Sequence, residues 1–384
     1  MNAGVVVPGQ DRVDSVDVRR GRQSFLARRQ RPLLLVGALV VLLLASVFLF
    51  RGGFWGQLVT QMLIFAIAAM GVDFLGGYGG LVSLGQASWL GLGAYGVAVS
   101  MTRGAGPWAA IGISLGVLLV VALIAGLLAV RVSGISFVIM TLALGQILFG
   151  LSSSLIDVSG GDNGLIIPIN PVLGPMDLND TRHLSFAVLA VFVLSAVVLW
   201  TFVHSPFGLS LRGIKSNEQR LRTLGYSTWL HRYIGYVVSV IFGGIAGILY
   251  VFTNGLVTPT ALDLGHNGII TLMAVVGGLG TLWGPALGSV MILLLQQYVS
   301  IYVERWATVM GLLFVAIVVF APEGVWGVGK KYARRLSHQS SRVPPVGIAA
   351  ALPSDDAIPT VEPIESIEPN ESIKPNEPIE EEVR

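Results

Sequence analysis

The chain has 384 residues, of which 53% are hydrophobic and only 12% are charged. Soluble domains carry about 25% charged residues, so this composition, with its long apolar runs, excludes an ordinary soluble protein and indicates a polytopic membrane protein. The formal net charge of +2 favours no class of partner, and the absence of Cys excludes disulfides, zinc–thiolate sites and cysteine nucleophiles.

Apolar segments of membrane-spanning length recur along most of the chain. A spanning helix needs about 20 apolar residues, and ten segments qualify as candidates: 33–50, 55–75, 82–101, 108–130, 135–155, 184–203, 233–253, 268–283, 285–303 and 306–321. The third segment and the eighth and ninth are rich in Gly, so each is a candidate for a broken or re-entrant helix. The sequence therefore predicts an all-α membrane protein with about ten spans, and an eight-span version stays open.

The basic residues predict the orientation. With ten spans, 20 of the 24 Lys and Arg residues lie on the side of the two termini, which the positive-inside rule makes cytoplasmic. They fall in a basic arm (1–32), at Arg131, in the loop 204–232 and in the tail 329–384. The arm precedes a run that resembles a signal peptide, but we favour a first membrane helix. The permease domain would span 33–328, and the Pro/Glu-rich part of the tail is predicted to be disordered.

Glycine spacing within the apolar segments predicts helix packing. Gly91, Gly93 and Gly96 match a dinucleotide-binding pattern, but no acidic residue follows at the required distance and no strand is expected before them. Small residues in membrane helices instead let backbones approach closely. Four Gly-x-x-x-Gly pairs fit the same role: Gly76/Gly80, Gly112/Gly116, Gly243/Gly247 and Gly284/Gly288. The external loop 156–183, with its Pro, Gly, Asn and Asp residues, predicts turns.

Residues suited to catalysis are sparse. The segment from Gly324 to Lys331 nearly matches a phosphate-binding loop, but Lys331 stands where Ser or Thr is required. We therefore predict no nucleotide site, no metal site and no catalytic residue. Asp73 is expected to reach the membrane interface at the cytoplasmic end of its span. Neutral polar residues within spans are expected to form interhelical hydrogen bonds; they are Gln61, Gln86, Thr141, Gln146, Gln296 and Gln297.

The cytoplasmic loop 204–232 contains a predicted amphipathic helix from Leu209 to Leu224. Its apolar positions Leu211, Ile214, Leu221 and Leu224 fall near one face, and Gly225 is a suitable end. Such a helix either lies on anionic lipid or fits a groove on another protein, and the residues alone favour neither.

Three blocks resemble the M-type permease subunits of high-affinity branched-chain amino acid ABC importers. They are "GYGGLVSLGQASWLGLGAY" (Gly77–Tyr95), "SPFGLSLRGIKSNEQRLRTLGY" (Ser205–Tyr226) and "AVVGGLGTLWGPALGSV" (Ala274–Val290), and "GISFVIMTLALGQIL" (Gly134–Leu148) also fits. The likeness covers roughly residues 35–328. Gln86 stands where relatives often have His, and Trp89 replaces a usual Phe, which places the identity of the substrate in question.

The resemblance implies a bacterial plasma-membrane permease that works with a second related permease, two cytoplasmic ATPases and an extracytoplasmic binding protein. It needs no cofactor and no nucleic acid. It also assigns the loop helix to coupling with an ATPase, through Arg212, Ile214, Asn217, Glu218, Leu224 and Gly225. Candidate substrate-pathway residues are Ser83, Gly85, Gln86, Gly91, Gly93, Thr141, Gln146, Gly278 and Gly280.

Three other functions stay open. Related permeases carry urea or short amides, and more distant ones carry sugars. A stand-alone secondary carrier would need no ATPase, although the spans lack an evident proton relay. A membrane-embedded enzyme is disfavoured because the five His residues are scattered along the chain.

Overall fold

The computed structural model describes residues 53–167, 172–173, 176–177, 181–303, 305, 308–309, 311–312, 315–316 and 324–327. This part of the chain is an all-α bundle, as predicted. Six of its helices are long and apolar enough to cross a membrane. They are α2 (Phe54–Asp73, continued by the π-helix η1, Phe74–Tyr78), α4 (Pro107–Ala129), α5 (Ile135–Ser154), α7 (Thr181–His204), α10 (Thr228–Asn254) and α12 (Gly284–Tyr302).

Two predicted spans are shorter than expected. The segment 82–101 becomes α3 (Gln86–Thr102), and the segment 268–283 becomes α11 (Leu264–Gly277), a helix of 14 residues followed by a turn. The predicted spans 33–50 and most of 306–321 lie outside the described residues, as do the arm 1–32 and the tail 329–384. Two of the three Gly-rich segments thus depart from simple spanning helices, whereas the third, 285–303, forms the continuous helix α12.

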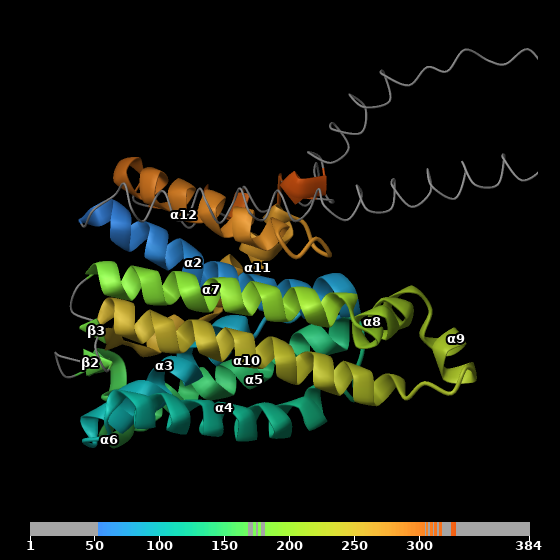
Figure 1. Cartoon of the computed structure of the whole chain (residues 1–384), viewed down its shortest axis with the longest axis horizontal. Helices are drawn as coiled ribbons and strands as arrows, with labels where there is room; N and C mark the ends of the chain where they lie inside the picture. The colour runs from blue at the N-terminus through green and yellow to red at the C-terminus, as the bar shows by residue number, and fades with distance from the viewer. Residues whose placement is uncertain are drawn as a thin grey trace, which may run out of the picture. The chain divides into compact units, whose positions relative to one another are not determined.

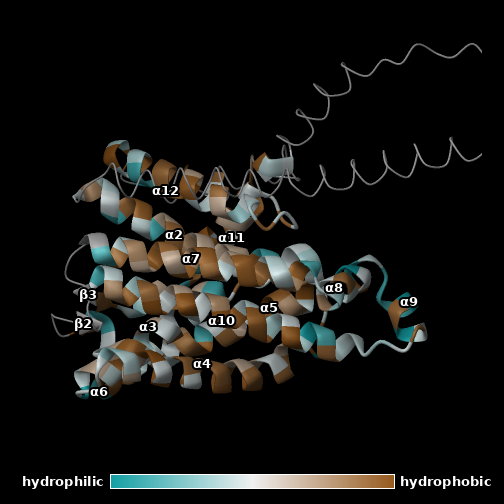
Figure 2. Ribbon diagram, in the orientation of Figure 1, coloured by the Kyte–Doolittle hydropathy of each residue, from teal (hydrophilic) through white to brown (hydrophobic). Residues whose placement is uncertain are grey.

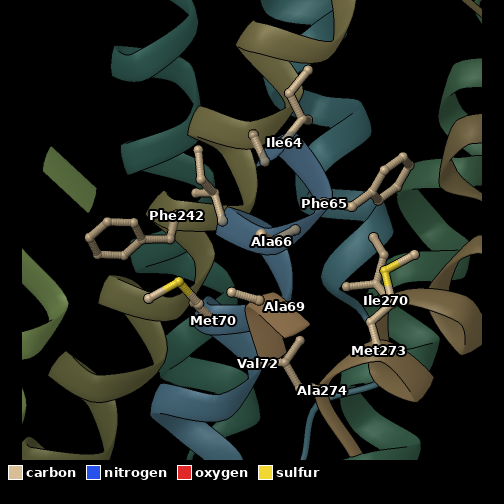
Figure 3. Packing of buried hydrophobic residues seen from close by; sticks show 14 of the residues in the cluster. Ile64, Phe65, Ala66, Ala69, Met70, Val72, Phe242, Ile270, Met273 and Ala274 are labelled. Carbon is tan, nitrogen blue, oxygen red and sulfur yellow. The ribbon is translucent and has the colours of Figure 1, made fainter. Parts of the chain in front are cut away.

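Helix α2 lies at the centre of the bundle. It packs against α7, α10, α11 and α12, and most of its side chains are buried. Figure 3 shows side chains of α2 facing Phe242 of α10 on one side and Ile270 and Met273 of α11 on the other. Because α2 contacts all four of these helices, a change at the end of α2 can affect the packing of several helices.

The outer helices have an apolar surface. The buried face of α4 consists mainly of small residues at helical spacing, namely Ala110, Ser114, Leu118, Ala122, Ala125 and Ala129. Its exposed face carries large aliphatic side chains such as Val120 and Ile124, and α5 likewise exposes Ile139 and Ile147. Both helices are largely brown, the colour of hydrophobic residues, in Figure 2. Small residues inside and large apolar residues outside are what a helix bundle in lipid requires.

The two ends of the bundle differ (Figure 1). At one end α8 (Pro206–Ser216) and α9 (Glu218–Thr223) project beyond α7 and α10. At the other end lie α6 (Ile156–Ser159) and the pair of β2 (Val172–Leu173) with β3 (Met176–Asp177). The remaining short elements are η2 (Gly161–Asn163), β1 (Leu165–Ile166), β4 (Leu256–Val257), which pairs with β1, and η3 (Pro259–Leu262).

Candidate functional site

Helix α3 begins inside the bundle. Gly80, with a φ of 74°, turns the chain after η1, and residues 81–85 are not helical. The Leu84 N–H donates to Thr141 Oγ1 of α5 over 3.3 Å, and the backbone at Gly85 lies so close to the Thr141 carbonyl that a Cβ would sit 2.7 Å from its oxygen. The first turn of α3 is therefore anchored to α5, and the Gln86 side chain is buried.

Asn267 joins the beginnings of α3 and α11. Its Oδ1 accepts the N–H of Ala87 over 2.7 Å, and its Nδ2 donates to Ser88 Oγ and to the carbonyls of Leu262 and Asp263 at 3.0–3.3 Å. The side chain is 1% exposed. The N-terminus of a helix carries a partial positive charge from its unpaired N–H groups. Two such ends thus meet around one neutral amide in the interior of the bundle.

Gln86 extends this polar cluster to α10 and α2. Its Nε2 donates to the Ser239 carbonyl over 3.0 Å, and Ser239 Oγ donates to the Gly71 carbonyl over 2.7 Å. A Cβ at Gly71 or Gly243 would crowd Gln86 Nε2. The prediction of an interhelical hydrogen bond is confirmed for Gln86, as it is for Gln61, whose Nε2 donates to Asn254 Oδ1 of α10 over 3.2 Å.

The predicted substrate-pathway residues fall into separate groups. Ser83, Gly85, Gln86 and Thr141 lie together at the start of α3. Gly91 and Gly93 lie further along α3, where a Cβ would overlap the Leu262 side chain and the Gly244 carbonyl respectively. Gln146 lies on α5, and its Nε2 has no hydrogen-bond partner within the described part of the chain. Gly278 and Gly280 belong to the turn between α11 and α12.

The Gly-x-x-x-Gly predictions are partly confirmed. A Cβ at Gly247 would overlap the Leu90 carbonyl of α3, and one at Gly288 would overlap the Met273 carbonyl of α11. Within the part of the chain that the structure describes, the prediction is wrong for Gly112 and Gly116, because nothing lies within 4 Å of a Cβ at either position. These two glycines lie on the outer face of α4, where spacing alone cannot reveal whether a neighbour exists.

Asp73 does not reach the interface, contrary to the prediction. Its side chain is fully buried, and its carboxylate accepts the N–H of Gly280 and, over 2.9 Å, the N–H of Leu282. These donors belong to the turn that joins α11 to α12. Asp73 is also the one acidic residue within the long helices that the structure describes. Backbone donors more than 200 positions away in the sequence explain why no local pattern revealed this role.

The predicted loop helix is broken in two. Helix α8 ends at Ser216, and Asn217, with a φ of −161°, is extended and caps α9 by accepting the Arg220 N–H over 3.0 Å. The continuous helix from Leu209 to Leu224 is thus wrong, because Asn217 forms a second N-cap. Gly225 does end the helix, with a φ of 84°, and Tyr226 N–H donates to the Leu221 carbonyl over 3.1 Å.

The predicted coupling residues lie on both sides of this break. Ile214 is buried, and so is Leu211, whereas Leu224 is 68% exposed. The Arg212 guanidinium donates to the Val203 carbonyl over 3.1 Å and lies 4.9 Å from the centre of the Tyr78 ring. The buried positions attach α8 to the bundle, and the exposed ones face away from it.

Glu218 attaches α9 to α10. Its carboxylate forms ion pairs with Arg222 at 2.7 Å and with Arg232 at 2.5 Å, and it accepts the Thr228 hydroxyl over 3.2 Å. The resemblance implies that Glu218 contacts a partner, and in the structure Glu218 also holds its own loop together. The cluster thus joins α9 to the first turns of α10.

Comparison with known proteins gives a consistent family. Residues 55–321 match the family described as branched-chain amino acid transport system / permease component. The chain is 23% identical to the "High-affinity branched-chain amino acid transport system permease protein LivM" of Escherichia coli (strain K12), over 75% of this chain and 73% of that protein. It is 33% identical to the "Guanosine ABC transporter permease protein NupQ" of Bacillus subtilis (strain 168), over 34% of this chain and 40% of that protein. No solved structure shows a significant match to the chain.

Proposed function

The chain belongs to the family of branched-chain amino acid transport permease components, and from that premise we propose that it is the membrane subunit of an ABC importer for branched-chain or similar hydrophobic amino acids. It is a multi-pass membrane protein, which we place in a bacterial plasma membrane. A second related permease, two cytoplasmic ATPases and an extracytoplasmic binding protein would complete the transporter. Lipid would cover the apolar outer faces of α4 and α5.

The proposed substrate class rests mainly on one observation, the meeting of two helix N-termini at Asn267. Transporters use the positive ends of interrupted helices to bind an anionic substrate group, and exposed carbonyl oxygens to bind cations. The starts of α3 and α11, capped by Asn267 and Asp263, are such N-termini, and the carbonyls of Leu262 and Asp263, which accept the Asn267 amide, lie beside them. This combination suits a zwitterionic amino acid better than a solute that carries a single charge.

The burial of this cluster supports alternating access. Ser83, Gln86, Ser88 and Asn267 are each at most 2% exposed, so a solute reaches them only if α3, α5 or α11 moves. A protein that exchanges between two packed arrangements exposes such a site to one side at a time. The projecting unit α8–α9 is the part we assign to contact with the ATPases, because it extends beyond the bundle and exposes Leu224.

The substrate class is tested by uptake in cells that carry the complete transporter. Radiolabelled leucine, isoleucine and valine should accumulate, and unlabelled leucine should compete. The relative named for guanosine favours a nucleoside as the second candidate, so guanosine is measured in parallel, with urea as a small neutral amide. Accumulation of guanosine or urea without accumulation of any amino acid would reject the proposed substrate.

A further inference from the structure

Lys215 fixes α8 to the end of α2. From the last turn of α8, its Nζ donates to the Gly77 carbonyl of η1 over 2.6 Å. The aliphatic part of the same side chain covers Gly80, where a Cβ would lie 2.9 Å from Lys215 Cγ. The packing of the Lys215 side chain therefore requires a glycine at position 80. It holds the projecting unit against the backbone of residues 77–80.

The same stretch of backbone touches the α11–α12 turn. A Cβ at Gly77 would overlap both the backbone of Gly280 and the Asp73 carboxylate. That carboxylate accepts the N–H groups of Gly280 and Leu282. Lys215, Gly77, Asp73 and the turn thus form one contiguous set of contacts between α8 and α11.

The turn depends on these contacts for its conformation. Leu282 has a φ of 61°, a left-handed conformation that a non-Gly residue keeps only when its surroundings hold it. Its N–H is one of the two that Asp73 accepts. A buried carboxylate within a membrane helix is costly, and such residues are retained where they have a specific partner. Here the partner is the turn.

We propose that Asp73 is a positioning residue that couples α8 to the α11–α12 turn through Gly77. Helix α11 begins at the polar cluster around Asn267 and ends at this turn, and a 14-residue helix spans about 21 Å as a rigid element. Movement of α8 is thereby transmitted to the place where α3 and α11 begin. The inference deepens the proposed function and rests on it for the source of the movement.

The physical link is tested without added ATP, by hydrogen exchange of the full-length chain in lipid nanodiscs together with the subunits that copurify with it. Lys215→Met should raise the exchange rates of the Gly280 and Leu282 amides about fivefold or more, because a coupling of about 1 kcal/mol has that effect. Lys215→Arg keeps a donor and should raise them less. Asp73→Asn, which replaces one acceptor oxygen by a donor, should raise exchange in α8 as well as in the turn.

Ser289→Ala is the matched control for these variants. Ser289 Oγ donates to the Met62 carbonyl over 3.2 Å, so it also joins α12 to α2, but away from the turn. Its removal should leave exchange in α8 unchanged. If Lys215→Met leaves the Gly280 and Leu282 amides unchanged, the link does not exist, and that result is decisive even if Asp73→Asn fails to accumulate.

The consequence for transport is measured in proteoliposomes that contain the complete transporter. Lys215→Met and Asp73→Asn should each lower the amount of solute taken up per ATP hydrolysed about fivefold or more. The double variant should be no worse than the poorer single variant, because both residues act on one path. An unchanged ratio, or losses that multiply in the double variant, would overturn the inference. Absence of ATP-dependent uptake by the wild type would instead refute the proposed function, while hydrogen exchange still decides the link.

Discussion

At the residue scale, function depends on a few buried polar groups in an otherwise apolar bundle. Asn267 and Asp73 each receive backbone N–H groups from a different helix or turn. In hydrocarbon an unpaired backbone group is costly, so each of these side chains determines where a non-helical segment can lie. One or two polar side chains therefore anchor each interruption.

Replacement of Asn267 by Ala should destabilise the protein. The change leaves the buried Ala87 N–H without its partner, and one buried unsatisfied group costs about 1–3 kcal/mol. The Ser88 hydroxyl loses the Asn267 donor but still donates to the Leu262 carbonyl. We expect a lower thermal unfolding midpoint in detergent. Asn254→Ala, which removes a half-buried amide bonded to Gln61, is the control and should lower the midpoint less. Equal midpoints for Asn267→Ala and the wild type would show that the amide does not hold the two helices.

Some of these residues were predictable and others were not. Gln86 stood out because an amide in an apolar span needs a partner. Asn267 lies one residue before the predicted span 268–283 and is therefore not among the predicted site residues. Asp263 is a recognisable N-cap signal that would place the start of the helix before Asn267. The expectation that Asp73 lies at the interface is wrong, because its donors come from the turn at 280–282 and sequence order does not reveal such proximity.

At the element scale, glycine determines how closely α3 and α10 approach. The Gly93 Cα faces the backbone of Gly244, and Gly247 faces the backbone of Leu90. The pattern of small residues predicted close packing in general. It did not predict which glycines have a neighbour, since Gly112 and Gly93 have similar surroundings in the sequence but different ones in space.

Gly93→Ala and Gly112→Ala form a matched pair. At Gly93 the added methyl group would overlap the Gly244 carbonyl, and overpacking of this kind costs about 1–3 kcal/mol. At Gly112 no described atom lies within 4 Å, so the methyl group should be neutral or slightly stabilising. Thermal unfolding in detergent should rank Gly93→Ala below the wild type and Gly112→Ala at or above it. The reverse order would contradict the packing of α3 on α10.

The division of the loop helix into α8 and α9 has a measurable consequence. Glu218→Ala removes the ion pairs to Arg222 and Arg232, and a loss of about 1–2 kcal/mol would raise the open population of α9 about five- to thirtyfold. Trypsin should then cut after Arg220 or Arg222 correspondingly faster. Gln219→Ala, at an exposed neighbouring position, should be cut at the wild-type rate. Identical rates for both variants would mean that Glu218 does not anchor α9.

At the scale of the whole molecule, the predicted fold class is confirmed and the broken helices are the main refinement. Composition and hydropathy sufficed for an all-α membrane bundle because apolar length is the dominant signal. The late start of α3 and the early end of α11 depend on Asn267, Thr141 and Asp73, which act across large sequence separations. Hydropathy does not detect such contacts, so the sequence predicted interruptions without their positions.

The predicted orientation rests on the distribution of Lys and Arg, and the absence of Cys makes it simple to test. A membrane-impermeant maleimide added to intact cells should label Asn163→Cys, at the end of the bundle that holds α6. It should label Ser216→Cys, at the end of α8, only after the membrane is permeabilised. Both positions are exposed. Labelling of Ser216→Cys in intact cells would invert the orientation and remove α8 from reach of cytoplasmic ATPases.

The most direct test of the central claim compares proteoliposomes with and without the ATPase subunits. In these vesicles the ATPases face the lumen, ATP is enclosed inside, and the binding protein and leucine are added outside. We predict that the complete transporter then accumulates leucine against its gradient. The permease pair alone should neither hydrolyse ATP nor concentrate leucine under an imposed proton or sodium gradient. Concentration of leucine by the permease chains alone would contradict the account and make this protein a self-sufficient carrier.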